Sequence, residues 1–276
     1  MRLSIVTINR NNSIGLEKTL QSVASQTFKG FEYVIIDGAS TDGSVEVIKK
    51  YESEFAHLRW VSEPDSGIYN AMNKGTRMAS GDYVQILNSG DCLAAPDVTE
   101  RILEALGKAG NPSMLYGNMV KCFPNGRRYI DKNFQGREVA FLYFYLGTLN
   151  HDPTYIRRDL FEKYGYYDEN LKIVSDWKWF MQAIVLGGER PEYVDMDVTL
   201  FDMTGISETN DELVKAERKA VLEQTFPKAI LLDYARYAEP MDRYDRLCRH
   251  PWALRLTGFL ERCLFKLEKM KGKNKL

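Results

Sequence analysis

Short apolar runs alternate with segments of helical periodicity over the first hundred residues. The runs at 3–8, 33–36, 58–61 and 83–87 are largely hydrophobic, as strands are when helices cover both faces of a parallel sheet. Apolar residues then recur three or four positions apart, which predicts helices over 16–27, 45–51, 68–78 and 96–108. Four repeats of strand and helix predict an α/β fold with an open, mostly parallel sheet flanked by helices.

The pattern changes in the second part of the chain. Residues 114–130 predict an antiparallel hairpin around a turn at 124–126, and helices are expected at 155–165 and 174–187. From 211 onward the chain is expected to be mainly helical. The sequence therefore predicts one α/β domain over 1–210, with halves at 1–110 and 111–210, and a helical C-terminal extension over 211–276.

The composition is that of an ordinary soluble globular protein. Of 276 residues 44% are hydrophobic and 27% charged, and a net charge of −1 excludes a polycation built to bind nucleic acid. The charge is uneven, because residues 249–276 hold eight Lys or Arg against two Asp or Glu. The cysteines are scattered, and there is neither a signal peptide nor an apolar run of about 20 residues. These features predict a cytoplasmic protein with reduced thiols and no spanning helix.

Polar side chains stand where the predicted strands end. Asp37, Asp65 and Asp91 follow the second, third and fourth strands, and Thr7 and Asn9 close the first. Open parallel sheets bind ligands outside the carboxyl ends of their strands, so these residues predict a polar cleft. The sequence has no G-x-G-x-x-G after the first strand and no G-x-x-x-x-G-K-[ST], which argues against Rossmann dinucleotide and P-loop sites.

An ordered set of short motifs resembles glycosyltransferase family 2. The matching segments are SIVT (4–7), IIDGASTDG (35–43), PDSGIYNAMNKG (64–75) and SGDYV (80–84) through Asp91. The resemblance extends over roughly residues 1–210 and implies the GT-A fold, a nucleotide-sugar donor and inversion of the anomeric centre. It also implies that the half 1–110 binds the donor and that the half 111–210 holds the acceptor and the catalytic groups.

The resemblance assigns the donor to the strand ends of the first half. Asp37 matches the acid that accepts a hydrogen bond from the base. A carboxylate only accepts hydrogen bonds, so it selects bases with a ring N–H, such as uracil, thymine or guanine, and a UDP-sugar is expected. Asp65 matches a second acid on the nucleotide side, and Lys74 can approach the diphosphate. The other residues expected to contact the donor are Thr7, Asn9, Asn88, Ser89 and Gly90.

Asp91 matches the acid of the family's D-x-D motif, which holds a divalent cation against the donor diphosphate. Oxygen ligands suit Mg²⁺ or Mn²⁺, and the ion acts as a Lewis acid on the leaving group. The segment 88–91 reads NSGD, with one acid where many members of the family have two or three. Because one carboxylate binds a free ion poorly, we expect the metal to arrive with the donor.

Inverting transfer also needs a carboxylate that takes the proton of the attacking hydroxyl. Asp176 occupies the place of the family's base in the segment VSDWKW (174–179), with Ser175 where a Glu is usual. Asp168 and Glu169, in the preceding turn-like stretch, rank second for this role.

Two further segments are expected to flank the reaction. Residues 150–154 resemble the segment that precedes the base helix in the family, so His151 and Asp152 are expected on the acceptor side. Residues 205–207 resemble a downstream loop that closes over the donor. The expected acceptor is a growing cell-surface glycan or a lipid-linked oligosaccharide.

Three options remain open for the basic tail. Its cations and apolar residues such as Trp252 and Phe259 are typical of a helix in a membrane interface, which predicts a peripheral protein on the cytoplasmic face of the cell membrane. The alternatives are packing on the domain and a homodimer interface.

Two other functions use a similar sheet and stay open as alternatives. A metal-dependent nucleotidyltransferase usually has a Gly-rich basic loop after its first strand, where this chain has NRNN at 9–12. A non-catalytic nucleotide-sugar-binding module would lack the base that Asp176 is expected to supply.

Overall fold

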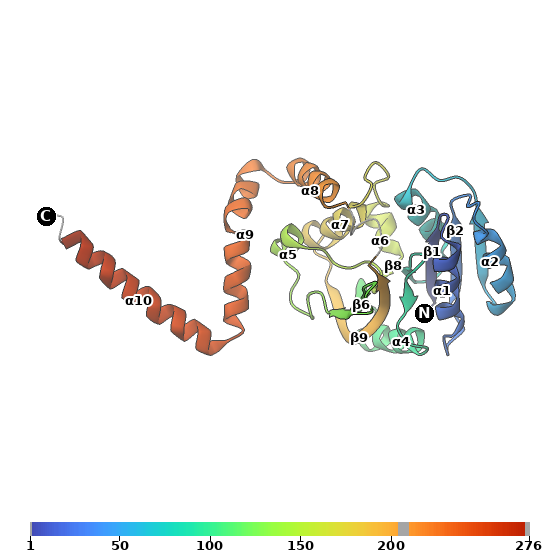
Figure 1. Cartoon of the computed structure of the whole chain (residues 1–276), viewed down its shortest axis with the longest axis horizontal. Helices are drawn as coiled ribbons and strands as arrows, with labels where there is room; N and C mark the ends of the chain where they lie inside the picture. Colours follow the sequence, from blue (N-terminus) through green and yellow to red (C-terminus); the bar gives the residue numbers. More distant parts are fainter. Residues whose placement is uncertain (1, 204–209, 274–276) are drawn as a thin grey trace. The chain divides into compact units, whose positions relative to one another are not determined.

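The computed structural model describes residues 2–203 and 210–273 and divides the chain into two compact units, Met1–Gln224 and Thr225–Leu276 (Figure 1). The first unit carries the α/β fold. It includes nearly all of helix α8 (Asp211–Thr225), which the sequence analysis assigns to the C-terminal extension. The loop at 205–207 lies outside the described residues.

Strands and helices alternate through the first hundred residues as the sequence predicts. Before α8 they are, in chain order, β1 (Leu3–Asn9), α1 (Ser13–Ala24), β2 (Glu32–Asp37), α2 (Ser44–Tyr51), the 3₁₀-helix η1 (Glu52–Glu54), β3 (Leu58–Ser62), α3 (Ile68–Met78), β4 (Tyr83–Ile86), β5 (Cys92–Leu93), α4 (Val98–Lys108), β6 (Met114–Cys122), β7 (Arg128–Asp131), α5 (Phe141–Leu146), β8 (Thr154–Arg157), α6 (Asp159–Tyr164), α7 (Ser175–Phe180), the π-helix η2 (Met181–Leu186) and β9 (Pro191–Asp202).

The strands form one mixed sheet in the order β3-β2-β1-β4-β8-β6-β9-β5, with β7 paired to β6. Strands β1 to β4 are joined by parallel pairs, as expected, whereas β8 runs antiparallel to both β4 and β6. Strand β9 is parallel to β6, and β7 forms with β6 the antiparallel hairpin predicted for 114–130. The parallel part of the sheet therefore comes from the first half of the chain.

Helices cover both faces of the parallel strands. Odd-numbered residues of β1 and β2, among them Ile5 and Ile35, join a core with α1, α2 and α4. Successive side chains of a strand point to opposite faces, so the even-numbered residues meet α3. There Gly75 lets the helix approach so closely that an added Cβ would lie 2.3 Å from Val6 Cγ1. The two helical layers leave the strand ends free to build a site.

Two strands of the second half differ from what the sequence predicts. The spacing predicts a helix over 155–165, but Thr154–Arg157 form β8, and Asp159–Tyr164 form the helix α6. Tyr155 and Ile156 suit a strand, and they are buried where β8 pairs with its neighbours. Strand β9 is not among the predicted elements, although Val194, Met196 and Val198 alternate with polar residues at the spacing of a strand.

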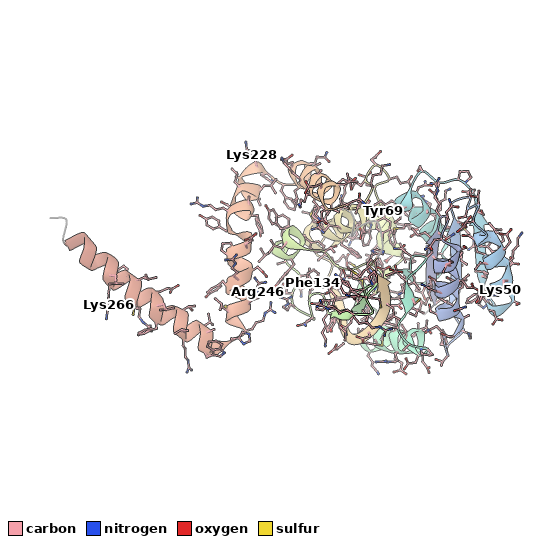
Figure 2. The ribbon with its side chains drawn as sticks, viewed as in Figure 1. Lys50, Tyr69, Phe134, Lys228, Arg246 and Lys266 are labelled. Atoms are coloured by element: carbon pink, nitrogen blue, oxygen red, sulfur yellow. The ribbon has the colours of Figure 1, made fainter. Side chains whose placement is uncertain are left out.

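The second unit consists of α9 (Lys228–Cys248) and α10 (Pro251–Lys273), on which Figure 2 marks Lys228, Arg246 and Lys266. Within the parts of the chain that the structure describes, no helix has both the length and the apolar character to cross a membrane. Large apolar side chains of α10 are nevertheless exposed: Trp252, Leu256, Phe259, Leu260, Leu264, Phe265 and Leu267.

Candidate active site

Parallel pairing aligns the ends of the first three strands in one polar row. Asn9 of β1 is the partner of Asp37 of β2, which is the partner of Ser62 of β3. The buried Asp37 carboxylate accepts hydrogen bonds from Asn9 Nδ2 (2.8 Å) and Ser62 Oγ (2.6 Å). It also accepts from the backbone N–H (2.9 Å) and the hydroxyl (2.6 Å) of Ser40. Burial raises the pKa of Asp37, but these hydrogen bonds outweigh it and hold the pKa below its ordinary value.

Asp65, in the loop between β3 and α3, lies over Gly38. An added Cβ on Gly38 would lie 2.3 Å from Asp65 Oδ2, so a larger residue at this position would displace the Asp65 carboxylate. Oδ1 of Asp65 accepts a hydrogen bond from the Gly67 N–H (3.1 Å) and lies 3.6 Å from the Arg10 guanidinium. The acid is thereby fixed beside the row of strand ends.

The loop after β4 is held by Thr19 of α1. The Thr19 hydroxyl donates to the Asp91 carbonyl (2.7 Å) and accepts from the Gly90 N–H (2.9 Å). Gly90 has φ of +110°, a conformation that favours glycine. Asp91 itself is buried, and its Oδ1 accepts the Asp202 backbone N–H of β9 at 2.8 Å.

Strand β8 brings a second carboxylate to Asp91. Because β8 is antiparallel to β4, the residues before it lie where β4 ends, and Gln85 Nε2 of β4 donates to the Asp152 carbonyl at 2.8 Å. The side chains of Asp152 and Asp91 are both buried, and their carboxyl groups interact electrostatically. Burial, with repulsion between the two acids, raises the pKa of Asp91 well above its ordinary value, and burial also raises the pKa of Asp152. Asp152 is expected on the acceptor side, but the structure places it beside the expected metal ligand.

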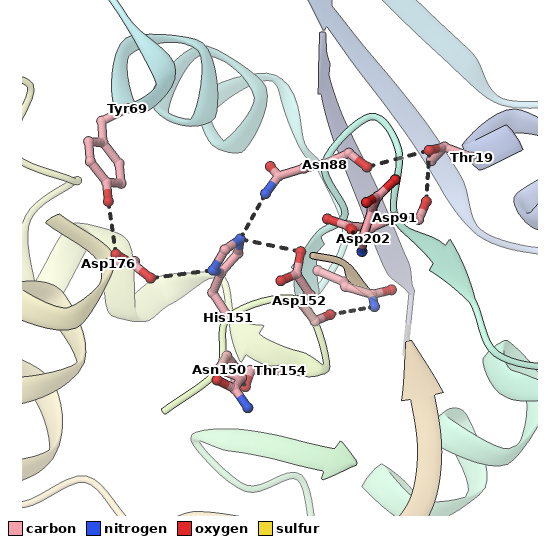
Figure 3. Close-up of polar contacts among 11 residues, drawn as sticks. Thr19, Tyr69, Asn88, Asp91, Asn150, His151, Asp152, Thr154, Asp176 and Asp202 are labelled. Atoms are coloured by element: carbon pink, nitrogen blue, oxygen red, sulfur yellow. Dashed lines mark hydrogen bonds and ion pairs between the residues drawn. The ribbon is translucent and has the colours of Figure 1, made fainter. Parts of the chain in front are cut away.

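His151 links this acid pair to Asp176 (Figure 3). His151 Nε2 lies 3.3 Å from Asp152 Oδ1 and 3.1 Å from Asn88 Nδ2, and its Nδ1 lies 3.3 Å from Asp176 Oδ2. Burial lowers the pKa of His151, but the carboxylates of Asp152 and Asp176 outweigh it and raise the pKa to about 9. The ring is therefore an imidazolium at neutral pH.

Asp176 is the second residue of α7, and Tyr69 of α3 holds its other oxygen. The Tyr69 hydroxyl donates to Asp176 Oδ1 at 2.8 Å. Burial raises the pKa of Asp176, but hydrogen bonds from His151 and Tyr69 and the charge of His151 lower it below its ordinary value. Asp176 is thus an ionised carboxylate that can accept a proton.

One cleft of about 750 Å³ gathers most of the residues that the sequence singles out. Its lining includes Asn9, Asp65, Asn88, Ser89, Gly90, Asp91, His151, Asp152 and Asp176. Thr7, Asp37 and Lys74 are not in the lining as the structure describes it. Thr7 is buried with its hydroxyl 3.0 Å from the Tyr33 hydroxyl, and Lys74 pairs with Glu63 at 2.7 Å.

The two second-ranked base candidates hold loops together instead. Asp168 pairs with Lys178 at 2.7 Å, and Glu169 accepts hydrogen bonds from Asn70 and Asn73, each at 2.8 Å. These hydrogen bonds lower the pKa of both acids. Neither acid belongs to the described lining of the cleft.

Three residues at this site are not among those expected from the sequence. Tyr69 lies inside the motif at 64–75, but only its contact with Asp176 reveals its position. Glu217 accepts the backbone N–H groups of residues 172–174, and Arg218 lines the cleft. Both belong to α8, where no motif marks them.

The acid pair fits a divalent cation. Mn²⁺ and Mg²⁺ prefer oxygen ligands, and Asp91 and Asp152 bring two buried carboxylates together in the lining of the cleft. No three His, Cys, Asp or Glu side chains in the described ranges form a complete metal site. Two carboxylates leave the other ligand positions to phosphate and water oxygens, so the residues suit a cation that binds together with the donor.

Comparison with known proteins gives the same picture. The model of glycosyl transferase family 2 matches residues 4–165. The chain is 33% identical over 212 residues to the uncharacterized glycosyltransferase Rv1514c of Mycobacterium tuberculosis, covering 74% of this chain and 76% of that protein.

Two solved structures share the fold. TarS of S. aureus, in complex with UDP-GlcNAc, has a TM-score of 0.64 at 22% identity over 83% of this chain and 69% of TarS. The mannosyltransferase PcManGT of Pyrobaculum calidifontis, in complex with GDP-Man and Mn²⁺, has a TM-score of 0.63 at 20% identity over 92% of this chain and 72% of that one. The expected GT-A-type architecture is thereby confirmed. With the family model matching more than half of its length, this chain belongs to glycosyl transferase family 2.

Proposed function

We propose that this glycosyltransferase moves a sugar from a UDP-sugar to an acceptor hydroxyl and inverts the anomeric centre. The observation that carries the proposal is the placement of ionised Asp176 and of the acid pair Asp91 and Asp152 in one cleft, joined through His151 (Figure 3). An inverting displacement needs a base on one side of the reacting carbon and a site for the leaving group on the other.

The chain's own groups divide the work of the reaction. Asp91 and Asp152 would hold Mn²⁺ or Mg²⁺, which when bound supplies Lewis-acid stabilisation of the diphosphate. Asp176 takes the proton of the acceptor hydroxyl. Tyr69 and His151 each hold one oxygen of Asp176, so the carboxylate is oriented before the acceptor arrives.

We assign recognition of the donor base to Asn9. Both oxygens of Asp37 are engaged by the chain itself, whereas Asn9 Oδ1 is buried, belongs to a cleft residue and receives no hydrogen bond from the described part of the chain. Asp37 fixes the Asn9 amide through the 2.8 Å bond, and Asn9 Oδ1 then accepts the ring N–H. Uracil and guanine, the bases of the ligands in the two solved structures, both offer such a donor.

Donor turnover tests the proposal. Incubation with UDP-sugars, with GDP-mannose for comparison, and Mn²⁺ should release free UDP slowly without acceptor, and Asp176→Asn should bind the donor without releasing UDP. Asp168→Asn, outside the cleft, is the matched control and should behave as wild type. Pyrophosphate release from a nucleoside triphosphate and a sugar phosphate would instead identify a nucleotidyltransferase, and donor binding by the wild type without turnover would identify a binding module.

For the second unit we propose attachment to an anionic membrane surface, which suits a glycolipid acceptor. Spacings of seven and four place Arg255, Arg262 and Lys266 along one side of α10, beside the exposed apolar stripe that contains Trp252 and Phe259. Each cation near an anionic leaflet contributes about 1 kcal/mol. Packing on the first unit and homodimer formation are the alternatives.

Sedimentation with liposomes tests this attachment. The full-length protein should sediment with anionic vesicles and not with neutral ones, and a chain that ends after Arg249 should stay in the supernatant. Sedimentation that is absent, or unchanged by the truncation, contradicts the proposal and leaves the transferase activity unaffected.

A further inference from the structure

Helix α8 contributes residues to the lining of the cleft, and contacts along one side of the helix fix its position. The Glu217 carboxylate accepts the N–H groups of residues 172–174, directly before α7. Val221 and Leu222, one turn further along, are buried. The neighbouring residue Arg218 is therefore held at a defined place relative to Asp176.

Among the residues that the structure describes, Arg218 has no ion-pair partner. Its guanidinium lies 5.1 Å from the centre of the Trp177 ring, and its Nε is buried with no hydrogen bond from the described chain. No described carboxylate comes within ion-pair distance of it, and burial lowers its pKa. A partly buried charge in this state is costly unless a ligand compensates it.

The other arginine and lysine side chains of the cleft differ from Arg218. Arg10 lies 3.6 Å from Asp65, and Lys121 lies 3.2 Å from Asp131. Lys18 and Lys172 are exposed to water. Arg218 thus combines burial, a place in the cleft lining and an unsatisfied donor.

The position of Arg218 selects the acceptor side of the cleft. Arg218 contacts Trp177, the residue next to Asp176. Its guanidinium also interacts electrostatically with the Asp176 carboxylate. The diphosphate belongs with Asp91 and Asp152, on the other side of His151. An anion bound by Arg218 would therefore enter with the group whose hydroxyl Asp176 deprotonates.

We propose that Arg218 binds an anionic group of the acceptor, a phosphate or a carboxylate, close to the attacking hydroxyl. This inference rests on the proposed function, because it takes Asp176 as the base. The planar guanidinium offers paired N–H donors that match both anions, which a lysine does not. The acceptor is accordingly an acidic glycan or a phosphate-linked glycolipid.

Binding of simple sugars in the presence of UDP and Mn²⁺ tests the proposal. With the donor side filled, glucose 1-phosphate, glucuronate and glucose are titrated by calorimetry against wild type, Arg218→Gln, Arg218→Lys and the control Lys219→Gln. Lys219 is exposed on the same helix and lies 3.9 Å from Glu223, so its substitution removes the same charge away from the cleft. Melting temperatures verify that each variant is folded.

We expect wild type and Lys219→Gln to bind at least one of the anionic sugars about tenfold or more tightly than glucose. Arg218→Gln should lose this preference and keep its UDP affinity, and Arg218→Lys, which keeps the charge but not the paired donors, should weaken it. The two anionic sugars tell phosphate from carboxylate. Equal binding of all three sugars by wild type overturns the proposal, as does a loss of UDP affinity in a folded Arg218 variant, which would assign the residue to the donor diphosphate. Failure of wild type to bind UDP at all would instead refute the proposed function.

Discussion

Removal of the Glu217 side chain should both destabilise the first unit and misplace the base. Its carboxylate accepts N–H groups at 2.7 Å from Lys172 and 3.0 Å from Ile173, with a longer contact of 3.3 Å to Val174. A hydrogen bond to a charged group contributes about 1.5–3 kcal/mol, less where water competes. The Lys172 bond is exposed and the other two are partly buried, so Glu217→Ala should lower the free energy of unfolding by about 3 kcal/mol.

The same contacts position Asp176, because residues 172–174 lead directly into α7. A displacement of about 1 Å at a reacting group costs on the order of 10²-fold in rate. We therefore expect kcat of Glu217→Ala to fall by about that factor. KM for the donor should stay unchanged, because the proposed donor site is formed by the loops after β1 and β4.

Urea unfolding and steady-state kinetics measure the two effects. Glu223→Ala is the matched control: it lies on the same helix, is exposed and pairs with Lys219 only at 3.9 Å, so its stability should change by less than about 1 kcal/mol. If Glu217→Ala unfolds at the same urea concentration as Glu223→Ala and keeps its kcat, the hydrogen bonds of Glu217 neither stabilise the first unit nor position Asp176. A rise in donor KM at constant kcat would show that α8 acts on donor binding instead.

Three further substitutions probe two groups of the cleft and the buried Asp37 beside it. Asp176→Asn should reduce transfer by about 10²–10⁴-fold in steady-state assays while UDP affinity is retained, and near-native transfer would move the base elsewhere. Asp152→Asn should weaken UDP binding in the presence of Mn²⁺, measured by calorimetry, and should leave UDP affinity in the presence of chelator equal to that of wild type. If the substitution lowers UDP affinity equally in both conditions, Asp152 is not a metal ligand. Asp37→Asn should lower the free energy of unfolding near neutral pH. The pKa of Asp37 is lower in the folded than in the unfolded chain, so ionised Asp37 stabilises the fold above about pH 3.8, and this stabilisation is lost as Asp37 is protonated at lower pH. The difference in stability between wild type and variant should therefore shrink as the pH falls below about 3.8. A deficit that does not change with pH in urea unfolding would contradict the ionised state of Asp37.

Local pattern is sufficient for the parallel half of this protein. The four parallel strands and the helices α1 to α4 follow from apolar periodicity, because each strand must bury both faces under helices that the same stretch of chain supplies, whereas β5 and η1 are not predicted. The meeting of Asn9 and Asp37 follows as well, since carboxyl ends of neighbouring parallel strands meet at one edge, whereas Ser62 joins them only through the register of β3. The pattern does not tell which of these side chains form hydrogen bonds within the protein and which stay available to a ligand. Both oxygens of Asp37 accept hydrogen bonds from the protein itself, whereas Asn9 lines the cleft.

The second half of the site depends on pairing between distant segments. Residues 154–157 have a local pattern that also suits a helix, and only pairing with β4 and β6 makes them a strand. That antiparallel pairing reverses the chain beside the end of β4, which is why Asp152 meets Asp91 and His151 meets Asn88. Glu217 and Arg218 reach the site because α8 packs back onto the residues before α7. The sequence by itself determined the residue types of the cleft and the edge of the sheet where they gather. Tertiary structure alone decided the acid pair, the His151 link and the position of Arg218, because each depends on contacts between segments that no local periodicity encodes.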